Sequence, residues 1–411
     1  MAFNPYPIGN VTDPFDDCES CGSFDPANPY GNGTIIDPYE DCNDVCINPD
    51  YFLKFPMWAA GYPYTIIGGG DTPRHYIFKD ELDLAYDKIS CGESHSLMVL
   101  NGILFSVGRN SEGQLGLGDN DKRYSYVQVD GSIINEISTG KNTTRKIHSD
   151  GSMWGTGYNY AGQLGTGDSN NVNSFVAIGA NNSWVKVMGG FYHMVALDSD
   201  GSLWACGYNS GGQCGLGETG YTETLMLIGD EEDDWTGSIL IDNLGLFTVL
   251  IGPNGHLWST GVNTYGVLGV GDYTHRNVFT LLDGVGGSNT FTSVACGDDH
   301  IMAIRSDGTL WATGSNQYGQ LGLGDTNNRN TLTQIGSNTY KKVACGYGHT
   351  LAIDTNDNLW GWGKNDGYQL GTDVGDNDDR ISPMAMPIGN TTMIWDDILA
   401  DYGTSVARSI E

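Results

Sequence analysis

Four cysteines near the amino terminus have a spacing that suits a metal ion. Cys18 and Cys21 are separated by two residues, Cys42 and Cys46 by three, and 20 residues lie between the two pairs. Four thiolates spaced in this way suit tetrahedral zinc, whereas an oxidising compartment would favour disulfides. Free thiols are the third alternative, because flanking carboxylates raise thiol pKa values and weaken metal binding. We expect residues 1–50 to form an acidic arm, with zinc as its candidate cofactor.

A second set of candidates is a histidine that recurs three residues after a glycine, in a Gly-x-x-His pattern. Its members are His95, His193, His300 and His349. Other residues stand at this position in further copies: Thr143, Thr248 and Thr404. Since the position changes chemistry from copy to copy, we expect it to bond to neighbouring backbone inside each repeat. No nucleophile elbow, phosphate-binding loop or His-Glu-x-x-His motif occurs, so the sequence predicts no catalytic residue and no enzyme.

Loops rich in Asp and Asn follow a Gly-x-Gly pattern in several copies, as at Asp119, Asp168, Asp325 and Asp376. Their oxygen atoms could bind calcium, but no segment has the twelve-residue loop that ends in Glu. We expect solvated turns. Tyrosines beside these loops could stack on sugar rings or serve the turn itself: Tyr158, Tyr160, Tyr208, Tyr265 and Tyr318.

These residues recur because the chain repeats one unit six times. Each copy runs from an aromatic residue to a glycine and then to a turn resembling Gly-Gln-Leu-Gly. The first glycines are Gly108, Gly157, Gly207, Gly261, Gly314 and Gly363. They are separated by 49, 50, 54, 53 and 49 residues. A fixed period near 50 residues indicates a repeat architecture.

Each period divides into four short strands. An apolar run ends at the Gly-x-x-His pattern, and a second apolar strand leads to a turn such as Asp307-Gly308. Asp-Gly and Asn-Gly are strong hairpin signals because both central residues of a type I′ turn need positive φ. The aromatic strand, a glycine-rich loop and a last strand complete the unit. Four antiparallel strands repeated in this way predict an all-β fold, a β-propeller.

The two ends of the repeat region complement each other. Gly61 ends an aromatic strand 47 residues before Gly108, and the tail contains only the opening strands of a repeat. We therefore predict a seven-bladed propeller over 51–411, with one blade shared by 51–83 and 395–411, which removes free sheet edges. The six complete repeats are expected at about 84–134, 135–181, 182–230, 231–285, 286–337 and 338–394.

The repeats resemble those of the regulator of chromosome condensation family. The shared features are Gly-x-x-His, the Asp-Gly turn, Trp-x-x-Gly, and Gly-Gln-Leu-Gly followed by Gly-Asp, all of which occur between Cys296 and Asp325. The resemblance covers about 51–411 and implies a seven-bladed propeller. It departs in the fourth copy, where Gly245-Leu246-Phe247-Thr248 replaces Gly-x-x-His and Val267 replaces the glutamine.

The family includes an exchange factor for a small nuclear GTPase, a plant ultraviolet receptor and many interaction modules. The receptor clusters tryptophans with arginines, whereas arginine is scarce here. We therefore expect packing between blades to be the role of the recurring tryptophans, which are Trp58, Trp154, Trp204, Trp258, Trp311 and Trp360.

The charge of the chain limits its partners. Fifty acidic and 19 basic residues give a net charge of −31, which repels phosphate backbones and anionic lipids. We expect no nucleic-acid partner. With no secretory signal and no run of 18 apolar residues, we also expect no membrane insertion.

The leading hypothesis is a structural and interaction protein of a virion, such as a phage capsid decoration, tail or fibre protein. Its propeller would be a binding platform, and its arm would dock on other structural proteins of the assembly. One alternative is a cytoplasmic regulator, either a guanine-nucleotide exchange factor or a chromatin-associated protein. The other is a carbohydrate-binding propeller whose partner is a surface glycan.

Overall fold

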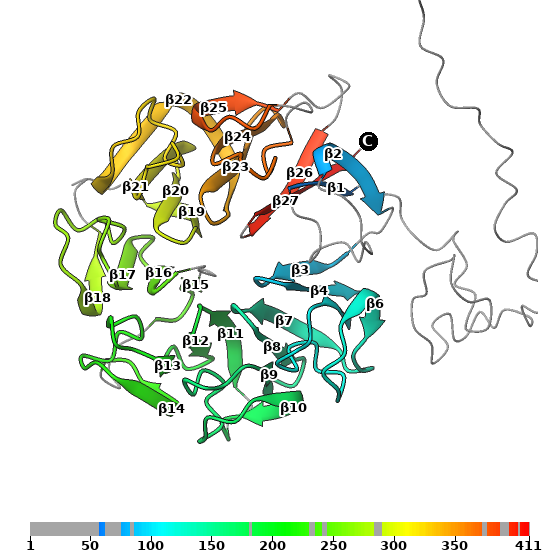
Figure 1. The fold of residues 1–411 in the computed structure, drawn as a ribbon. Helices are drawn as coiled ribbons and strands as arrows, with labels where there is room; N and C mark the ends of the chain where they lie inside the picture. Colours follow the sequence, from blue (N-terminus) through cyan, green and yellow to red (C-terminus); the bar gives the residue numbers. More distant parts are fainter. Residues whose placement is uncertain are drawn as a thin grey trace, which may run out of the picture.

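The computed structural model describes residues 57–61, 75–82, 86–180, 183–229, 235–240, 245–282, 290–371, 376–386, 394–401 and 403–410. These residues form antiparallel β-sheets arranged as a ring (Figure 1). Within them, no helix has the length and apolar character needed to cross a membrane. The arm and its four cysteines lie outside the described residues, so zinc there stays a prediction.

The first four sheets after the amino-terminal region have four strands each, in chain order. Blade 1 contains β3 (Lys88–Cys91), β4 (His95–Leu100), β5 (Ile103–Gly108) and β6 (Arg123–Gln128). Blade 2 contains β7 (Ile134–Thr139), β8 (Thr143–His148), β9 (Met153–Gly157) and β10 (Val172–Ile178). Blade 3 contains β11 (Trp184–Gly189), β12 (His193–Asp198), β13 (Leu203–Tyr208) and β14 (Tyr221–Leu227). Blade 4 contains β15 (Ile239–Leu240), β16 (Phe247–Ile251), β17 (Leu257–Gly261) and β18 (Arg276–Leu281).

The next sheet has seven strands and contains two blades joined by one long strand. Blade 5 contains β19 (Phe291–Cys296), β20 (His300–Arg305), β21 (Thr309–Gly314) and the first part of β22 (Arg329–Cys345). Blade 6 contains the last part of β22 with β23 (His349–Asp354), β24 (Leu359–Gly363) and β25 (Arg380–Ala385). The expected boundary between 337 and 338 therefore falls inside a continuous strand, because the connection bends at Gly336 without leaving the sheet.

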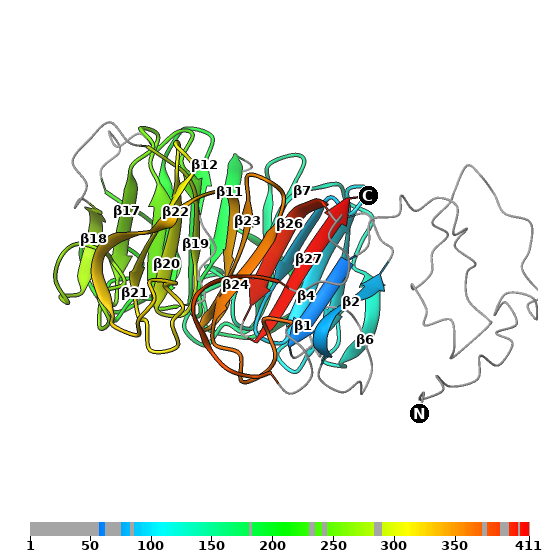
Figure 2. The same ribbon diagram turned by 90° about the horizontal axis from the view of Figure 1, so that it is seen from above.

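The last sheet joins the two ends of the repeat region. Its order is β2 (His75–Leu82), β1 (Met57–Gly61), β27 (Thr404–Ile410) and β26 (Ile394–Asp401). The register of β1 with β27 runs from Met57 opposite Arg408 to Gly61 opposite Thr404. Figure 2 shows these strands side by side, and we call this sheet the closing blade. Among the described residues it brings the number of four-stranded blades to seven.

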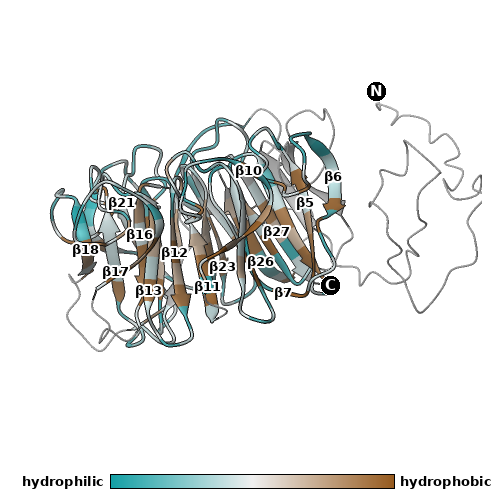
Figure 3. Cartoon of the chain, turned by 90° about the horizontal axis from the view of Figure 1, so that it is seen from below, coloured by the Kyte–Doolittle hydropathy of each residue, from teal (hydrophilic) through white to brown (hydrophobic). Residues whose placement is uncertain are grey.

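The core lies between the blades. The second strand of each of blades 3, 5 and 6 is buried along its whole length, and apolar clusters combine residues of neighbouring blades. One such cluster joins Phe247 and Val249 of blade 4 to Ile301 and Ala303 of blade 5. Figure 3 shows apolar residues concentrated along the strands and hydrophilic residues on the loops. The predicted all-β propeller is confirmed.

The two faces of the ring carry different loops. One face carries both the Gly-x-x-His loops and the loops that follow the aromatic strands, because β3, β4 and β5 alternate in direction. In blade 1, for example, the Arg109 N–H donates to the Ser94 carbonyl over 2.7 Å. We call this side the histidine face. The Asp-Gly and Asn-Gly turns lie on the opposite side, which we call the turn face.

Ion pairs link the innermost strands around the centre of the ring. Lys88 and Lys186 both approach the Glu136 carboxylate, at 2.9 and 3.1 Å, and so connect blades 1, 2 and 3. Lys342 of blade 6 pairs with Asp397 of the closing blade at 2.8 Å. These pairs are partly exposed and therefore contribute more to the alignment of the blades than to stability.

Candidate functional site

The recurring histidines are connectors between blades. Their imidazoles are buried, and each Nε2 lies within hydrogen-bond distance of a hydroxyl on the next blade. The four pairs are His95 with Thr144 at 3.0 Å, His193 with Thr248 at 2.9 Å, His300 with Thr350 at 3.1 Å and His349 with Ser405 at 2.9 Å. The expected bond to backbone inside each repeat is corrected, since these partners are side chains of a neighbouring repeat.

In blades 2 and 4, where the histidine is missing, its partner changes as well. In blade 2 the Arg145 guanidinium takes its place, donating to Thr143 Oγ1 over 3.0 Å and to the Gln163 carbonyl over 2.8 Å. The facing residue of blade 3 is Met194, which has no hydroxyl. In blade 4 the position of the histidine is taken by Phe247 and not, as the spacing predicted, by Thr248, because Phe247 pairs with Gly261 as His193 pairs with Gly207. Phe247 lies in one apolar cluster with Ile301 of blade 5. Burial lowers the pKa of His193 and His300 to about 3, so neither is a proton carrier at neutral pH.

The recurring tryptophans with described side chains are packing residues. Trp204 and Trp360 donate their indole N–H to Asp198 and Asp354, at 3.0 and 2.9 Å. Trp311 lies under the Arg305 guanidinium, whose central carbon is 3.7 Å from the ring centroid. The side chain of Trp58 lies outside the described residues.

The acidic loops have a structural role that the sequence only partly indicates. The carboxylates of Asp272 and Asp325 pair with an arginine four residues later, at 2.7 and 2.8 Å. Asp119 and Asp376 make the same kind of pair. A recurring asparagine spans each loop: Asn316, for instance, donates to the Asp325 carbonyl and accepts from the Leu321 N–H. Among the described residues, no group of three His, Cys, Asp or Glu side chains is placed to hold a metal ion.

The described cysteines of the propeller are buried and form no disulfide. Cys91, Cys296 and Cys345 each stand directly before the glycine of a Gly-x-x-His pattern. Cys206 and Cys214 are not bonded to each other, and burial raises the pKa of Cys206 to about 12. None of these thiols is therefore suited to act as a nucleophile.

The side chains that could act on a partner lie at the centre of the histidine face. There the variable residues inside the Gly-x-x-His loops converge, and we call the group of Glu93, Lys141, Asp298, Asp299 and Tyr347 the central mouth. Lys141 lies 3.7 Å from Glu93. Its positive charge also reaches Asp298, a residue from a blade on the other side of the ring, and partly opposes the rise in the pKa of Asp298 that burial causes. Tyr347 is exposed and feels the charges of both aspartates.

The two aspartates of the central mouth hold their protons unusually tightly. Burial, with a contribution from the neighbouring Asp299, raises the pKa of Asp298 to about 7. Burial alone raises that of Asp299 to about 6. Both carboxyl groups therefore change charge close to neutral pH, and they lie where the loops leave them accessible to a partner.

Five aromatic rings of blades 2 and 3 form a row on the histidine face, and the middle ring of the row lies beside the central mouth. The ring centroids are 5.3 to 6.4 Å apart along Tyr160, Tyr158, Tyr192, Tyr208 and Tyr221. The outermost rings are the most exposed, at 75% for Tyr160 and 66% for Tyr221. Lys141 lies 5.8 Å from the Tyr192 ring centroid, so the row reaches the central mouth. We call these five residues the aromatic row.

Reasoning from the sequence identified some of this site and missed the rest. It selected Tyr158, Tyr160 and Tyr208, which the structure brings into one row, whereas Tyr265 and Tyr318 stand on other blades. It did not select Asp298, Asp299, Lys141 or Tyr192. Their signal was the pair of variable residues inside each Gly-x-x-His pattern, which the fold collects at one place.

Comparisons with known proteins agree with the repeat pattern. Models of the regulator of chromosome condensation (RCC1) repeat match residues 184–213, 291–320 and 340–369, and also 254–304 and 307–353. The human X-linked retinitis pigmentosa GTPase regulator is 29% identical over 59% of this chain and 24% of its own length. The ultraviolet-B receptor UVR8 of Arabidopsis thaliana is 31% identical over 58% of this chain and 55% of its own length. The chain therefore spans less than two thirds of either relative.

A solved structure shows the same fold. Prp20p from Saccharomyces cerevisiae superimposes with a TM-score of 0.75 at 17% identity, over 89% of this chain and 95% of that one. Prp20p is described as having binding properties to Gsp1p and histones. The repeat models, the relatives and the solved structure all point to the same repeat that the Gly-x-x-His and Gly-Gln-Leu-Gly motifs define. This chain carries regulator of chromosome condensation repeats, at residues 184–213 and 254–369.

Proposed function

We propose that the chain is a non-enzymatic platform that binds and regulates a small GTPase through the central mouth of the histidine face. The observation that carries this proposal is the convergence of Glu93, Lys141, Asp298, Asp299 and Tyr347 from four different blades. Charges of both signs beside an aromatic ring are typical of surfaces that orient a protein partner. A rigid ring holds them in place before the partner arrives, which reduces the entropy cost of binding.

The charge of the platform indicates the chemistry of the partner. With a net charge of −31, the chain repels polyanions and attracts proteins whose contact surface is basic. The ionised Asp298 and Asp299 would pair with lysines or arginines of that surface. Binding should therefore weaken as salt is added, because the pairs lie near solvent.

The relatives support a regulatory partner over a virion role. One relative is named a GTPase regulator, and Prp20p is described as binding Gsp1p and histones. These descriptions favour the exchange-factor alternative, and nothing in them supports the virion hypothesis. The docking role of residues 1–50 has no support from the described residues either.

A nucleotide-release assay tests the proposal. Small GTPases loaded with fluorescent GDP are mixed with the full chain, and we expect faster release from at least one of them. The double variant Asp298→Asn/Asp299→Asn should reduce the acceleration by about tenfold or more, which corresponds to about 1.4 kcal/mol. The matched control is Asp307→Asn on the turn face, which should leave the rate unchanged. The proposal would be contradicted if the chain accelerates release from none of the GTPases. It would also be contradicted if the double variant and Asp307→Asn change the rate equally.

The aromatic row favours a second candidate function, the binding of an extended basic segment such as a histone tail. Exposed tyrosine faces attract guanidinium and ammonium groups, and the row leads to the carboxyl groups of the central mouth. Titration with an arginine-rich peptide should show binding that Tyr160→Ser and Tyr221→Ser each weaken, while Tyr273→Ser on blade 4 does not. Equal affinity in all four proteins would remove this candidate.

A further inference from the structure

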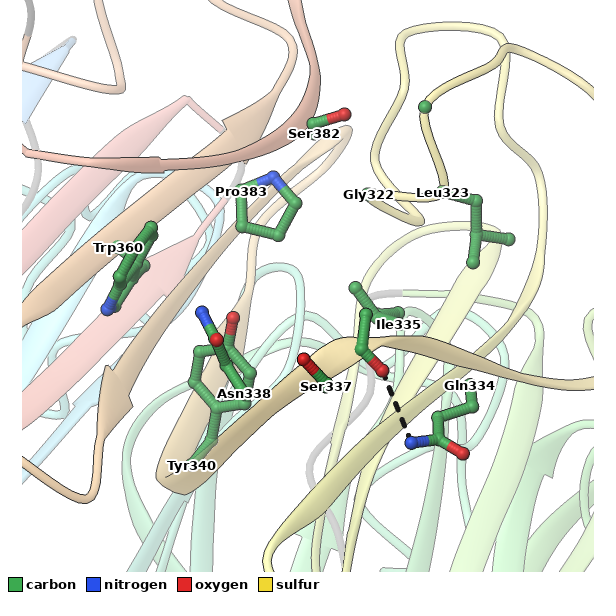
Figure 4. Close-up of a pocket in the computed structure, with 12 residues that line it drawn as sticks. Gly322, Leu323, Gln334, Ile335, Ser337, Asn338, Tyr340, Trp360, Ser382 and Pro383 are labelled. Atoms are coloured by element: carbon green, nitrogen blue, oxygen red, sulfur yellow. Dashed lines mark hydrogen bonds between the residues drawn. The ribbon is translucent and has the colours of Figure 1, made fainter.

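A pocket of about 450 Å³ opens between blades 5 and 6, away from the central mouth (Figure 4). One wall is formed by Leu323, in the loop after β21, and by Ile335 of β22. Figure 4 shows Trp360 and Pro383 of blade 6 on the opposite side, with Tyr340 and Asn338 below them. The volume lies within the range that small-molecule sites usually have, about 300 to 1,000 Å³.

One residue in the wall of the pocket, Pro383, differs in size from those that the other complete blades have at the same register. Pro383 is three residues after Arg380, the residue that pairs with Gly363. The residues at this register in blades 1 to 5 are Tyr126, Phe175, Leu225, Phe279 and Leu332. Each of these five is part of an apolar cluster between its blade and the preceding one. Proline is smaller than any of them, but the space in front of Gly322 is filled by the buried Trp362 indole, whose Nε1 would lie 2.8 Å from an added Cβ. The pocket is therefore the space bounded by Trp360, Pro383 and Leu323 rather than the site of a missing side chain.

The walls of the pocket combine apolar rings with neutral polar groups. The Trp360 indole N–H is already bonded to Asp354 at 2.9 Å, so the indole presents its ring rather than its donor. Pro383 and the buried Tyr340 extend this apolar surface. Exposed amides and hydroxyls of Gln334, Ser337, Asn338 and Ser382 complete the lining. No charged side chain lines the pocket, although the chain has a net charge of −31.

This lining selects among the classes of small ligand. A charged ligand would find no counter-charge in the walls, and an anion would also be repelled by the acidic chain. A fully apolar ligand would cover the amides and hydroxyls without replacing their bonds to water, which is unfavourable for each group. A neutral ring with one apolar face and several hydroxyls satisfies both parts of the lining.

We propose that this pocket binds an uncharged pyranose, the terminal unit of a neutral glycan. The C–H face of the sugar stacks on the Trp360 indole beside Pro383. Its hydroxyls reach the amides of Gln334 and Asn338 and the hydroxyls of Ser337 and Ser382. The site is separate from the central mouth, so it does not depend on the proposed GTPase partner.

Titration of the full chain with neutral sugars tests the proposal. The Trp360 indole N–H signal is assigned in a nuclear magnetic resonance spectrum by its loss in Trp360→Phe. Glucose, galactose, mannose and N-acetylglucosamine are then added separately, with glucuronate as the charged counterpart. We expect saturable shifts of the Trp360 signal with at least one neutral sugar, and weaker binding of glucuronate. Absence of a saturable shift with all four neutral sugars would overturn the proposal.

Two variants separate the pocket from the rest of the chain. Pro383→Phe puts a larger side chain, of the type found in blades 2 and 4, into the wall of the pocket, so affinity should fall about tenfold or more, or about 1.4 kcal/mol. Asn338→Ala removes an exposed amide without adding bulk and should also weaken binding. It tests the proposal if Pro383→Phe does not fold. The matched control is Trp311→Phe in blade 5, which should bind like the unmodified chain. Unchanged affinity in both pocket variants would overturn the proposal.

Discussion

At the scale of single residues, the structure shows a rule that connects neighbouring blades. A histidine lies beside a hydroxyl of the next blade, Phe247 packs with Ile301, and Arg145 donates to Thr143 and to the Gln163 carbonyl. Each histidine pairing gives the buried Nε2 a partner, since a polar atom buried without one is costly. Three blades lack the histidine, and in two of them, blades 2 and 4, the residue at the hydroxyl position of the next blade is changed as well.

This rule predicts the result of a double-mutant cycle at His193. The single variant His193→Phe should lower the free energy of unfolding by about 1–3 kcal/mol, because the buried Thr248 hydroxyl loses one of its two partners and keeps only the Gln213 carbonyl. The double variant His193→Phe/Thr248→Ile reproduces the pair found between blades 4 and 5 and should recover at least half of that loss. Urea unfolding measures both values. If the loss of unfolding free energy in the double variant equals the sum of the losses in the two single variants, the two positions are not coupled.

The central mouth should make stability depend on pH. Burial raises the pKa of Asp298 from 3.8 to about 7, so the folded chain holds this proton more tightly than the unfolded chain. The stabilising contribution is thus complete below about pH 4 and is lost as the pH rises toward 7. In Asp298→Asn this loss should disappear, so the free energy of unfolding should fall less between pH 4 and pH 7 than it does in the unmodified chain.

Urea unfolding at several pH values in this window compares the two proteins. The control is Asp307→Asn, because the hydrogen bonds from Thr309 lower the pKa of Asp307 and its effect lies at more acidic pH. An identical pH dependence for the unmodified chain and Asp298→Asn would contradict the prediction.

At the scale of the elements, the glycine-rich loop of one blade rests on the outer strand of the next. Gly217 N–H donates to the Asn277 carbonyl over 2.7 Å, and equivalent bonds recur at Gly167, Gly271 and Gly324. Close approach of two backbones is needed at Gly212, where an added Cβ would lie 2.6 Å from the Asn277 Cα. Small residues in the loop therefore set the distance between blades.

Two alanine variants in one loop separate close approach from backbone strain. Gly212 and Gly217 both have positive φ, at 86° and 78°, so alanine costs about 1 kcal/mol at either position. A Cβ at Gly217 meets nothing closer than 3.9 Å, whereas one at Gly212 would overlap the Arg276 carbonyl. Gly212→Ala should therefore cost about 1–3 kcal/mol more than Gly217→Ala in urea unfolding. Equal costs would mean that the spacing of the blades is easily adjusted.

At the scale of the whole molecule, the ring depends on strands from opposite ends of the repeat region. β1 pairs with β27, and the closing blade contacts both of its neighbours. Tyr86 before blade 1 donates to Asp397 of β26 over 3.2 Å, although 311 residues separate them. Closure removes two sheet edges and lets each blade stabilise the next.

Removal of residues 404–411 should open the ring. The deletion takes away the strand between β1 and β26, so amide hydrogen exchange should become about tenfold faster or more in β3 and β23, which border the closing blade. The matched control is deletion of residues 1–50, which the sequence assigns to a separate arm and which should leave this protection unchanged. Slow exchange in both truncated chains would show that the remaining blades hold together without closure.

The sequence by itself determined the repeat, the strand order within each blade and the propeller fold. These properties depend on local signals: a turn such as Asp307-Gly308, an aromatic strand and a period near 50 residues. The same local signals could not show that β22 runs unbroken from one blade into the next, because its continuity depends on neighbouring strands on both sides.

Only the tertiary structure decided which side chains meet. Asp298 and Lys141 lie 157 positions apart in the sequence and converge because the ring gathers one loop from every blade at its centre. The partner of each histidine is a hydroxyl one repeat away, and the pocket beside Trp360 brings together residues of two blades. Contacts of this kind depend on the distance between blades, which spacing along the chain does not specify.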